Sequence, residues 1–252
     1  MRRTVYRFHE VKALLATGLS DRKVAGRTGI PRSTIQNWRK RATPPSSLRR
    51  RGPSASWRPP HPERYCYLLG LYLGDGYLSC SIHASPRLVL TLDERYPAII
   101  TEAVDSIRKT APDVPVCLNR RQGSIAILAS NRSWVSAFPQ HGTGRKHQRR
   151  IELVGWQAQL TRTHPHALLR GLIHSDGSRV VNRFQTKLPS GRVATYAYPR
   201  YFFTNYSADI RGIFCDYCEL LGIRWTQSNG RNISVSHRDS VAILDSFVGP
   251  KN

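Results

Sequence analysis

Apolar and polar residues alternate along residues 65–248 in a pattern that occurs twice in the same order. Each cycle begins with apolar residues at helical spacing and continues with strict alternation, as in strands with one buried face. The first cycle predicts helices over 65–75, 95–110 and 131–138, with strands near 77–83, 87–92, 114–119 and 124–130. The second predicts helices over 165–176, 207–221 and 238–247, with strands near 178–185, 199–205, 223–228 and 231–236. The order is αββαββα both times.

This repetition predicts an α+β fold made of two pseudo-symmetric half-domains, residues 65–139 and 165–252. The intervening residues 140–164 predict a linker with one short helix at LVGWQAQL. Residues 187–197 have no counterpart in the first cycle, and we interpret them as a loop inserted between the first two strands of the second half.

Residues 1–43 have helical periodicity throughout and predict a separate all-α domain. The first helix ends at Gly18, Ser20 can cap a second helix that stops at Gly29, and Pro31 begins a third. The apolar stripe of the first helix is Val5, Phe8, Val11, Leu14 and Leu15. The other expected core residues are Val24, Ala25, Ile30, Ile35 and Trp38.

Two helices joined by a short glycine-bearing turn, with a polar and basic third segment, are typical of a helix-turn-helix. This segment is similar to the helix-turn-helix of resolvase- and transposase-type proteins. A three-helix bundle without a DNA-binding role is the alternative interpretation. In the helix-turn-helix interpretation, the residues that face DNA are Arg32, Ser33, Thr34, Gln36, Asn37, Arg39 and Lys40.

Residues 44–64 lack periodicity and are rich in proline, serine and arginine, which predicts a flexible basic tether. The chain as a whole has 39 lysines and arginines against 16 aspartates and glutamates, a formal net charge of +23. Most of the basic residues are arginine, whose planar fork pairs with phosphate oxygens, so the composition favours a nucleic-acid partner. A codon bias toward arginine is the alternative, but it does not explain the shortage of acidic residues.

The N-terminal residues lack the apolar run of a secretory leader, and no stretch approaches the length of a membrane span. Five cysteines are scattered along the chain, and the C-x-x-C at Cys215 and Cys218 has no second pair with which to form a zinc site. We therefore expect free thiols and a reducing compartment, the cytoplasm, in association with the nucleoid.

The helices that open the two cycles end in the same way, in LLGLYLGDGYLS at 68–79 and LLRGLIHSDGSR at 168–179. Aligned on Asp-Gly, Gly70 matches Gly171 and Gly74 matches Ser175, so each helix carries small residues four apart on one face. Such faces let two helix backbones approach closely. If the two helices pack together, Asp75 and Asp176 meet at their C-terminal ends. Gly76 and Gly177 would then supply a left-handed residue that turns each chain into its first strand.

Two carboxylates at the negative ends of helix dipoles repel each other unless a proton or a cation lies between them. Magnesium prefers carboxylate and backbone oxygen ligands, completed by water and phosphate oxygens. The repeated motif therefore predicts a Mg²⁺ site.

The paired motifs, together with the repeated αββαββα order, resemble the LAGLIDADG (dodecapeptide) homing endonucleases in their single-chain form, over about residues 65–248. The resemblance implies a monomer with internal pseudo-two-fold symmetry, in which two antiparallel sheets straddle double-stranded DNA. It also implies that Asp75 and Asp176 bind Mg²⁺ at the scissile phosphates, with the preceding Gly74 and Ser175 as further metal ligands. The family's other motif acid is Leu73 here and His174 in the second copy, and we expect His174 to lie in the helix interface.

Active sites of this family also hold a basic residue, and Lys146 in HGTGRKHQRR is the catalytic candidate, with a solvated basic linker as the alternative. No lysine occupies the equivalent place in the second half, where Arg238 is the nearest cation; this raises a question about cleavage of both strands.

In the saddle, alternate strand residues face DNA. Leu78, Cys80 and Ile82 are expected to point inward, as are Leu88, Leu90, Leu92, Ile233 and Val235. The expected DNA-facing strand residues are Ser79, Ser81, His83, Arg87, Thr91, Asn182, Asn232, Ser234 and Ser236. For SRVVNRFQT two registers compete: counting from Asp176 exposes Val180 and Asn182, whereas polarity favours Arg179, Arg183 and Gln185.

Three functions fit these features: a Mg²⁺-dependent, site-specific DNA endonuclease, a non-catalytic transcriptional regulator that reuses the same core as some bacterial factors do, and a maturase that binds intron RNA. The helix-turn-helix favours the regulator, and the retention of both aspartates favours the nuclease. No intein splice junction is present at either end.

Overall fold

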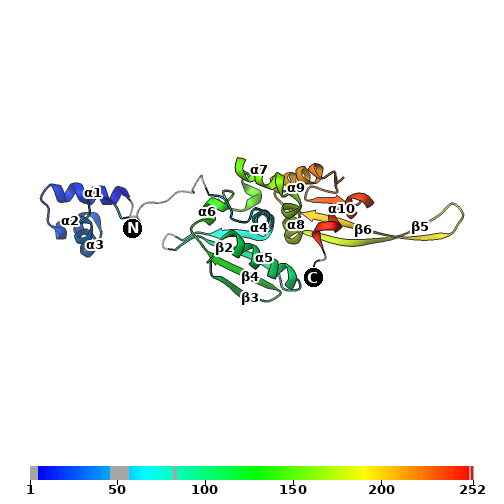
Figure 1. Ribbon diagram of the computed structural model, residues 1–252, viewed down its shortest axis with the longest axis horizontal. Coiled ribbons are helices and arrows are strands. Elements are labelled where there is room, and N and C mark those ends of the chain that lie inside the picture. Colours follow the sequence, from blue (N-terminus) through cyan, green and yellow to red (C-terminus); the bar gives the residue numbers. More distant parts are fainter. Residues whose placement is uncertain (1–4, 46–56, 82–83, 250, 252) are drawn as a thin grey trace. The chain divides into compact units, whose positions relative to one another are not determined.

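The computed structural model describes residues 5–45, 57–81, 84–249 and 251. It divides into two compact units, residues 1–54 and 55–252 (Figure 1). The first unit contains the helices α1 (Val5–Ala16), α2 (Asp21–Thr28) and α3 (Arg32–Arg39). The hydroxyl oxygen of Ser20 accepts a hydrogen bond from the backbone N–H of Lys23, and Gly29 ends α2 with a left-handed φ of 68°. These are the helix limits that the sequence predicts.

The core of the first unit is buried between its three helices and consists of the residues Phe8, Val11, Val24, Ile30, Ile35 and Trp38. Leu14, Leu15 and Ala25 pack against it while partly exposed. Phe8 and Val11 of the expected apolar stripe therefore lie in the core and Leu14 and Leu15 at its margin, whereas the side chain of Val5 lies outside the described part of the chain.

The second unit contains the predicted αββαββα order twice. Its first half consists of α4 (Pro62–Asp75), β1 (Gly76–Ser79), β2 (Arg87–Asp93), α5 (Pro97–Thr110), β3 (Val116–Arg121), β4 (Ser124–Ser130) and α6 (Trp134–Ala137). Its second half consists of α8 (Pro165–Asp176), β5 (Gly177–Lys187), β6 (Val193–Thr204), α9 (Ala208–Leu220), β7 (Thr226–Gln227), β8 (Asn232–Val235) and α10 (Arg238–Val248). The 3₁₀ turn Lys146–Gln148 and helix α7 (Gly155–Thr163), which was expected within the linker, lie between the halves.

The two sheets have the same antiparallel strand order, β1-β2-β4-β3 and β5-β6-β8-β7. In the first sheet Leu78 lies opposite Leu88, and Leu90 lies opposite Ile127, on the face that the helices cover. In the second sheet Tyr201 lies opposite Val235 on the equivalent face. Each sheet therefore has one face in the core and one open face, as the alternation predicts.

The interpretation of residues 187–197 as a loop is wrong. Strand β5 continues to Lys187 and pairs with β6 from Val193 onward, with only a short turn around Gly191 between them. The rings of Phe184 and Tyr196, on opposite strands, stack with centroids 5.4 Å apart. Cross-strand aromatic pairs stabilise a hairpin. The residues without a counterpart in the first half therefore lengthen this hairpin and form its turn.

The predicted tether, residues 44–64, extends too far toward the C-terminus, because its last residues already belong to the second unit. Trp57 packs edge-to-face against Tyr65 and Trp156, with centroids 5.6 Å apart in both pairs, and α4 already begins at Pro62. Residues 46–56 lie outside the described residues. The chain is therefore joined to the core of the second unit from Trp57 onward.

All five cysteines are free thiols, as expected, and Cys66, Cys215 and Cys218 are buried, whereas Cys80 and Cys117 are exposed. Burial raises the pKa of the Cys66 and Cys215 thiols to about 12, so both are protonated and unreactive. None of the described helices is long and apolar enough to cross a membrane.

Candidate active site at the paired helix ends

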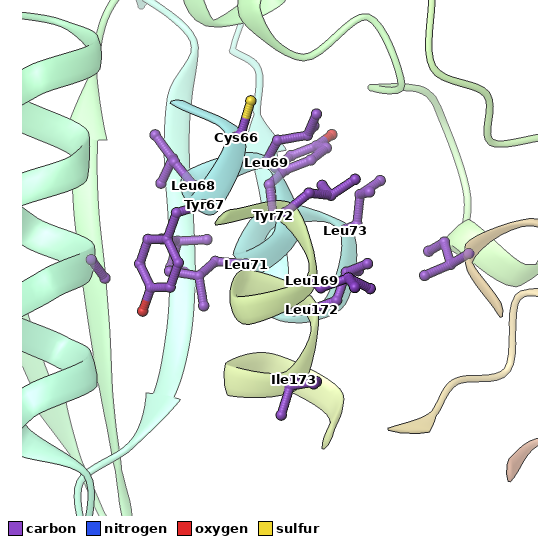
Figure 2. Close-up of a cluster of buried hydrophobic side chains, with 14 of the residues drawn as sticks. Cys66, Tyr67, Leu68, Leu69, Leu71, Tyr72, Leu73, Leu169, Leu172 and Ile173 are labelled. Atoms are coloured by element: carbon purple, nitrogen blue, oxygen red, sulfur yellow. The ribbon is translucent and has the colours of Figure 1, made fainter. Parts of the chain in front are cut away.

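Helices α4 and α8 pack against each other at the glycine positions that the sequence aligned. A Cβ added to Gly70 would lie 2.7 Å from the backbone nitrogen of Leu172, and one added to Gly171 would collide with the carbonyl oxygen of Tyr67. Leucines and tyrosines of α4 and the apolar side chains of Leu169, Leu172 and Ile173 of α8 surround this contact (Figure 2), and residues 65–73 of α4 are buried without interruption. The close backbone approach brings the C-terminal ends of the two helices together.

At those ends, Gly74 lies directly against Ser175 and the carboxylate of Asp176, because a Cβ on Gly74 would lie 2.8 Å from Asp176 Oδ2. The role assigned to Gly76 and Gly177 needs correction. Both have extended backbones, with φ of −101° and −99°, and neither is left-handed. They are glycines because a Cβ would strike the preceding helical turn, at the Cα atoms of Tyr72 and Ile173.

Asp75 and Asp176 are the last residues of the two helices and are partly buried. Burial and, next in size, the neighbouring charge of Asp176 together raise the pKa of Asp75 to about 7. Burial also raises the pKa of Asp176, opposed by a hydrogen bond from Asn205. The two carboxylates therefore lie close together, as predicted. Their mutual repulsion acts on the pKa of Asp75, whereas the hydrogen bond from Asn205 stabilises the charged form of Asp176.

Two groups from distant segments contact these helix ends. The side-chain amide of Asn205, just after β6, donates to Asp176 Oδ2 at 2.6 Å. The ammonium of Lys146 donates to the carbonyl oxygens of Leu73 and Gly74 at 2.8 Å and also to that of Tyr72. Burial lowers the pKa of Lys146 to about 8, although both aspartates oppose this. Lys146 was a sequence candidate, and Asn205 was not.

A cleft of about 610 Å³ contains both aspartates, Lys146 and Asn205. Its other walls come from β1 and from the glycine-rich segment around the 3₁₀ turn, including His141, His147 and Arg149, with Tyr206 from the second half. Sequence reasoning missed these four side chains because no motif marks them and they converge only through the fold.

The second half contains a cation that the sequence analysis also missed. The ammonium of Lys251 donates to the carbonyl oxygen of Gly177, directly after Asp176, and lines a small cavity of about 180 Å³ with Asp75. Arg238, the expected nearest cation, is instead exposed at the start of α10. Lys146 follows α6, the last helix of the first half, and Lys251 follows α10, the last helix of the second half. The segment between helix and lysine has a different length in the two halves, so aligning the halves by residue spacing does not match Lys146 with Lys251.

His174 lies in the helix interface, as expected, and is 4% exposed. Its Nε2–H donates to the carbonyl oxygen of Val248 at 3.0 Å, and its Nδ1 accepts from the hydroxyl of Tyr67 at 2.9 Å. Burial lowers the pKa of His174 to about 4. A neutral imidazole with both nitrogens occupied has a structural role.

Only some of the residues that were proposed as metal ligands have donor atoms free to bind a metal ion. Among the described residues, no three histidine, cysteine, aspartate or glutamate side chains converge on one point. The carboxylates of Asp75 and Asp176 are the available charged donors. The carbonyl of Gly74 already accepts from Lys146, and the hydroxyl of Ser175 donates within its own helix to Gly171 and Leu172. Two carboxylates completed by water and phosphate oxygens fit Mg²⁺ better than they fit zinc.

The open face of the first sheet carries Ser79, Arg87 and Thr91, as the alternation predicts. Ser81 is exposed just beyond β1, and His83 and Ile82 lie outside the described residues. Cys80 was expected to point inward but is exposed, with its Sγ 3.3 Å from His141 Nε2. β1 ends at Ser79, so the alternation no longer applies at Cys80.

In the second sheet, the cross-strand register places Val180, Asn182 and Phe184 on the face opposite the buried Tyr201 and Phe203. This resolves the competing registers in favour of counting from Asp176. Asn232 lies on the same open face, and Ser236 is exposed beyond β8. Ser234 also lies on this face, but it is only 3% exposed, so its expected DNA contact needs correction.

In the first unit, six of the seven residues expected to face DNA are exposed, and Thr34 is half-buried. Arg39 differs from the other six because its guanidinium lies 2.7 Å from Asp21 Oδ1. This ion pair joins α3 to α2 and reduces the availability of Arg39 for a phosphate.

The raised pKa of Asp75 predicts a pH-dependent stability without divalent metal. The folded state holds this proton up to about pH 7, whereas an unfolded carboxyl loses it near 3.8. The stabilisation that Asp75 contributes should therefore be complete below pH ~4 and be lost as the pH rises from there to about 7, by up to about 4 kcal/mol. Asp75→Asn should remove most of this decline. Urea unfolding at graded pH in EDTA measures the effect, and parallel curves for parent and variant would contradict it.

Comparison with known proteins agrees with this geometry at the level of fold. The structure of I-DmoI in complex with DNA and Mn matches with a TM-score of 0.50 at 15% identity, over 75% of this chain and 98% of that one. The LAGLIDADG meganuclease I-AabMI bound to uncleaved DNA matches with a TM-score of 0.46 at 12% identity, over 73% and 82%. The N-terminal LAGLIDADG domain of DUF199/WhiA matches with 0.45 at 12% identity, over 78% and 88%.

The sequence model of the homeodomain-like domain matches residues 7–45, which contain all of α2 and α3 and α1 except for its first two residues. No curated protein sequence matches the chain. The second unit therefore has the fold of the LAGLIDADG proteins, and the first contains a homeodomain-like helix-turn-helix, as the sequence resemblance implied.

Proposed function

We propose that this protein is a site-specific, double-stranded DNA endonuclease of the LAGLIDADG homing type that uses Mg²⁺ to hydrolyse phosphodiester bonds. The observation that carries the proposal is the carboxylate pair at the adjoining ends of α4 and α8, in a cleft that also contains Lys146. Two partly buried, neighbouring carboxylates cost stability, as the raised pKa of Asp75 indicates. A protein that used this helix pair only as a scaffold would gain nothing in return. A divalent cation would remove that cost.

Four residues of the cleft have a role in this proposal. Asp75 and Asp176 would hold the cation, which when bound supplies charge stabilisation at the scissile phosphate and lowers the pKa of a water. Asn205 orients the carboxylate of Asp176 through its 2.6 Å hydrogen bond. Lys146, whose pKa is lowered to about 8, can donate a proton or stabilise negative charge on a phosphate oxygen near neutral pH.

The partner is double-stranded DNA. The net charge of +23 favours a polyanion, and the open faces of both sheets carry polar side chains next to the cleft. The I-DmoI structure, which shares the fold, is a complex with DNA and Mn. A partner of this kind implies association with the nucleoid in the cytoplasm. The two halves of one chain supply the pseudo-symmetry, so the active species is a monomer.

Cleavage of a plasmid library that carries randomised inserts tests the proposal. Sequencing of the linear products after incubation with Mg²⁺ should recover a single recurring site, and EDTA should prevent the reaction. The absence of any enriched site at graded protein concentrations would contradict the proposal.

A non-catalytic DNA-binding regulator is the second candidate, and one observation favours it. Lys146, Lys251 and Asn205 all contact the ends of the motif helices, so the aspartates have favourable partners even without a metal. In that case DNA would be bound but not cut, and replacement of either aspartate would destabilise the fold.

Removal of residues 1–43 should leave the second unit folded, because the first unit has its own core. DNA affinity should fall, and the dependence of log affinity on log salt should become shallower by about 0.9 per lost phosphate contact. Fluorescence anisotropy across a salt series measures both, with a thermal melt to confirm folding. Unchanged affinity and slope would mean that the helix-turn-helix serves another partner.

A further inference from the structure

One cysteine of the first half has an imidazole beside it. Cys80 directly follows β1, and its Sγ lies 3.3 Å from Nε2 of His141, which follows α6 and is 61 positions away in the chain. The thiol is exposed to solvent, whereas His141 is partly buried and lines the cleft that contains Asp75 and Asp176. The fold therefore brings a nucleophilic side chain and a proton-accepting one together at the wall of the cleft.

The imidazole of His141 can take the proton of this thiol. Burial and, next in size, the positive charge of Arg149 lower the pKa of His141, so the ring is neutral near pH 7. With the ring proton on Nδ1, the Nε2 atom accepts a hydrogen bond from the S–H group of Cys80. A neutral imidazole within hydrogen-bond reach of a thiol is the arrangement that activates a cysteine nucleophile.

The other four cysteines lack this arrangement. Cys66, Cys215 and Cys218 are buried, and burial raises the pKa of each thiol, so all three stay protonated. Cys117 is exposed on β3, opposite Leu128 of β4, and its thiol makes no hydrogen bond to any residue that the structure describes. The chain thus contains two exposed thiols that differ in the presence of a proton acceptor.

The charge around Cys80 favours an anionic reactant. Arg145, Lys146 and Arg149 line the same cleft as His141, in a chain whose formal net charge is +23. Positive potential in a cleft raises the local concentration of small anions. Low-molecular-weight disulfides of the glutathione type carry several carboxylates and a net negative charge at neutral pH, so the cleft concentrates them beside the thiol.

We propose that Cys80 is a site of reversible S-thiolation by an anionic low-molecular-weight disulfide, with His141 as the proton acceptor. The thiol proton passes to Nε2 of His141, and the sulfur of Cys80 attacks one sulfur of the disulfide. A mixed disulfide forms, the original S–S bond breaks, and the departing thiolate takes the proton from the imidazolium. The Cys80 sulfur is thereby oxidised, and the small thiol that leaves is the reduced product. An excess of thiol reverses the reaction.

The adduct has a consequence for the cleft. It places carboxylates at the wall of the space in which a DNA phosphate must lie, so thiolated protein should bind duplex DNA more weakly than reduced protein. This consequence rests on the proposed function, whereas the reaction at Cys80 does not depend on it.

The rates at the two exposed thiols test the reaction in the unaltered protein. Reduced full-length protein is incubated with glutathione disulfide near neutral pH, and peptide mass spectrometry follows the adducts at Cys80 and Cys117 with time. Cys80 should react at least about tenfold faster, because a positioned general base contributes that much or more. Equal rates at the two thiols would overturn the proposal.

Two histidine variants separate the imidazole from the rest of the cleft. His141→Gln should slow thiolation of Cys80 to about the rate at Cys117. The matched control is His147→Gln, which removes from the same cleft an imidazole whose ring lies against Tyr206 instead of a thiol. The control should leave the rate at Cys80 unchanged, and a thermal melt checks that both variants are folded. A His141→Gln protein that reacts as fast as the control would show that His141 is not the proton acceptor.

Fluorescence anisotropy with duplex DNA in Ca²⁺ measures the consequence for binding. Parent protein treated until Cys80 is converted should bind about tenfold more weakly than reduced protein, and dithiothreitol should restore its affinity. Cys80→Ser, treated for the same time, should bind as it does without treatment. Thiolation of Cys80 with unchanged affinity would overturn the effect on the cleft and leave DNA binding intact. A reduced parent that binds no duplex would refute the proposed function, and the reaction rates would still decide the proposal for Cys80.

Discussion

Asp75→Asn and Asp176→Asn are each expected to abolish DNA cleavage while leaving DNA affinity close to that of the parent. Each change removes one of the two charged donors at the helix ends but no surface that contacts the duplex. Loss of metal-based charge stabilisation worth several kcal/mol corresponds to a fall in rate of about 10³-fold or more. Single-turnover cleavage in Mg²⁺ and anisotropy in Ca²⁺ measure the two quantities on the same DNA.

Asp105→Asn is the matched control. Asp105 is an aspartate on α5 with a side chain 44% exposed and a single long ion pair, at 3.7 Å, to Arg64. It should cut at the parent's rate. If instead both motif variants cut normally, the carboxylates are not the catalytic centre. If both lose stability together with DNA binding, the aspartates are structural and the regulator becomes the better description.

Gly171→Ala is expected to unfold the second unit or to destabilise it by about 3 kcal/mol or more. The added methyl group would lie inside the contact distance of Tyr67's carbonyl oxygen and 3.0 Å from the Cα of Gly70. Both neighbours are backbone, which cannot rotate away as a side chain can, so the helices must separate and expose core. Chemical denaturation followed by circular dichroism measures the loss.

Gly212→Ala on α9 is the control, because nothing lies within 4 Å of the position a Cβ would take there. Alanine has the higher helix propensity, so this variant should be as stable as the parent or up to about 1 kcal/mol more stable. If Gly171→Ala unfolded at the same denaturant concentration as the Gly212→Ala control, α4 and α8 would not be closely packed in solution.

The sequence predicted the parts of the fold that depend on local periodicity. The order of helices and strands follows from residue spacing within single elements, the meeting of Gly70 with Gly171 follows from the alignment of the two motifs, and the interface position of His174 follows from the family resemblance. The Asp-Gly repeat was informative because two copies impose a relation between distant segments. A single Asp-Gly pair after a helix would have predicted only an ordinary turn.

The remaining parts of the site depend on three-dimensional convergence that spacing does not encode. Lys251 reaches the helix ends from a segment of a different length from the one that carries Lys146. Gly76 was expected to be left-handed because Asp-Gly usually turns, whereas its actual constraint is the adjacent backbone of Tyr72. Residues 187–197 looked like a loop because a ribbon exposed on both faces lacks the hydrophobic alternation of a half-buried strand.

The continuous burial of α4 from Tyr65 to Leu73 has a consequence for biosynthesis. Because α8 covers one side of α4, α4 cannot complete its packing until the ribosome has synthesised α8. The two aspartates that end these helices are 101 positions apart in the chain. At about 5–20 residues per second, the ribosome needs roughly 5–20 s to supply that partner. During this interval the glycine-lined face of α4 is open to solvent and complementary to the same face on another nascent chain. Neighbouring ribosomes on one messenger RNA therefore present copies that can pair wrongly, and slower translation lengthens that exposure.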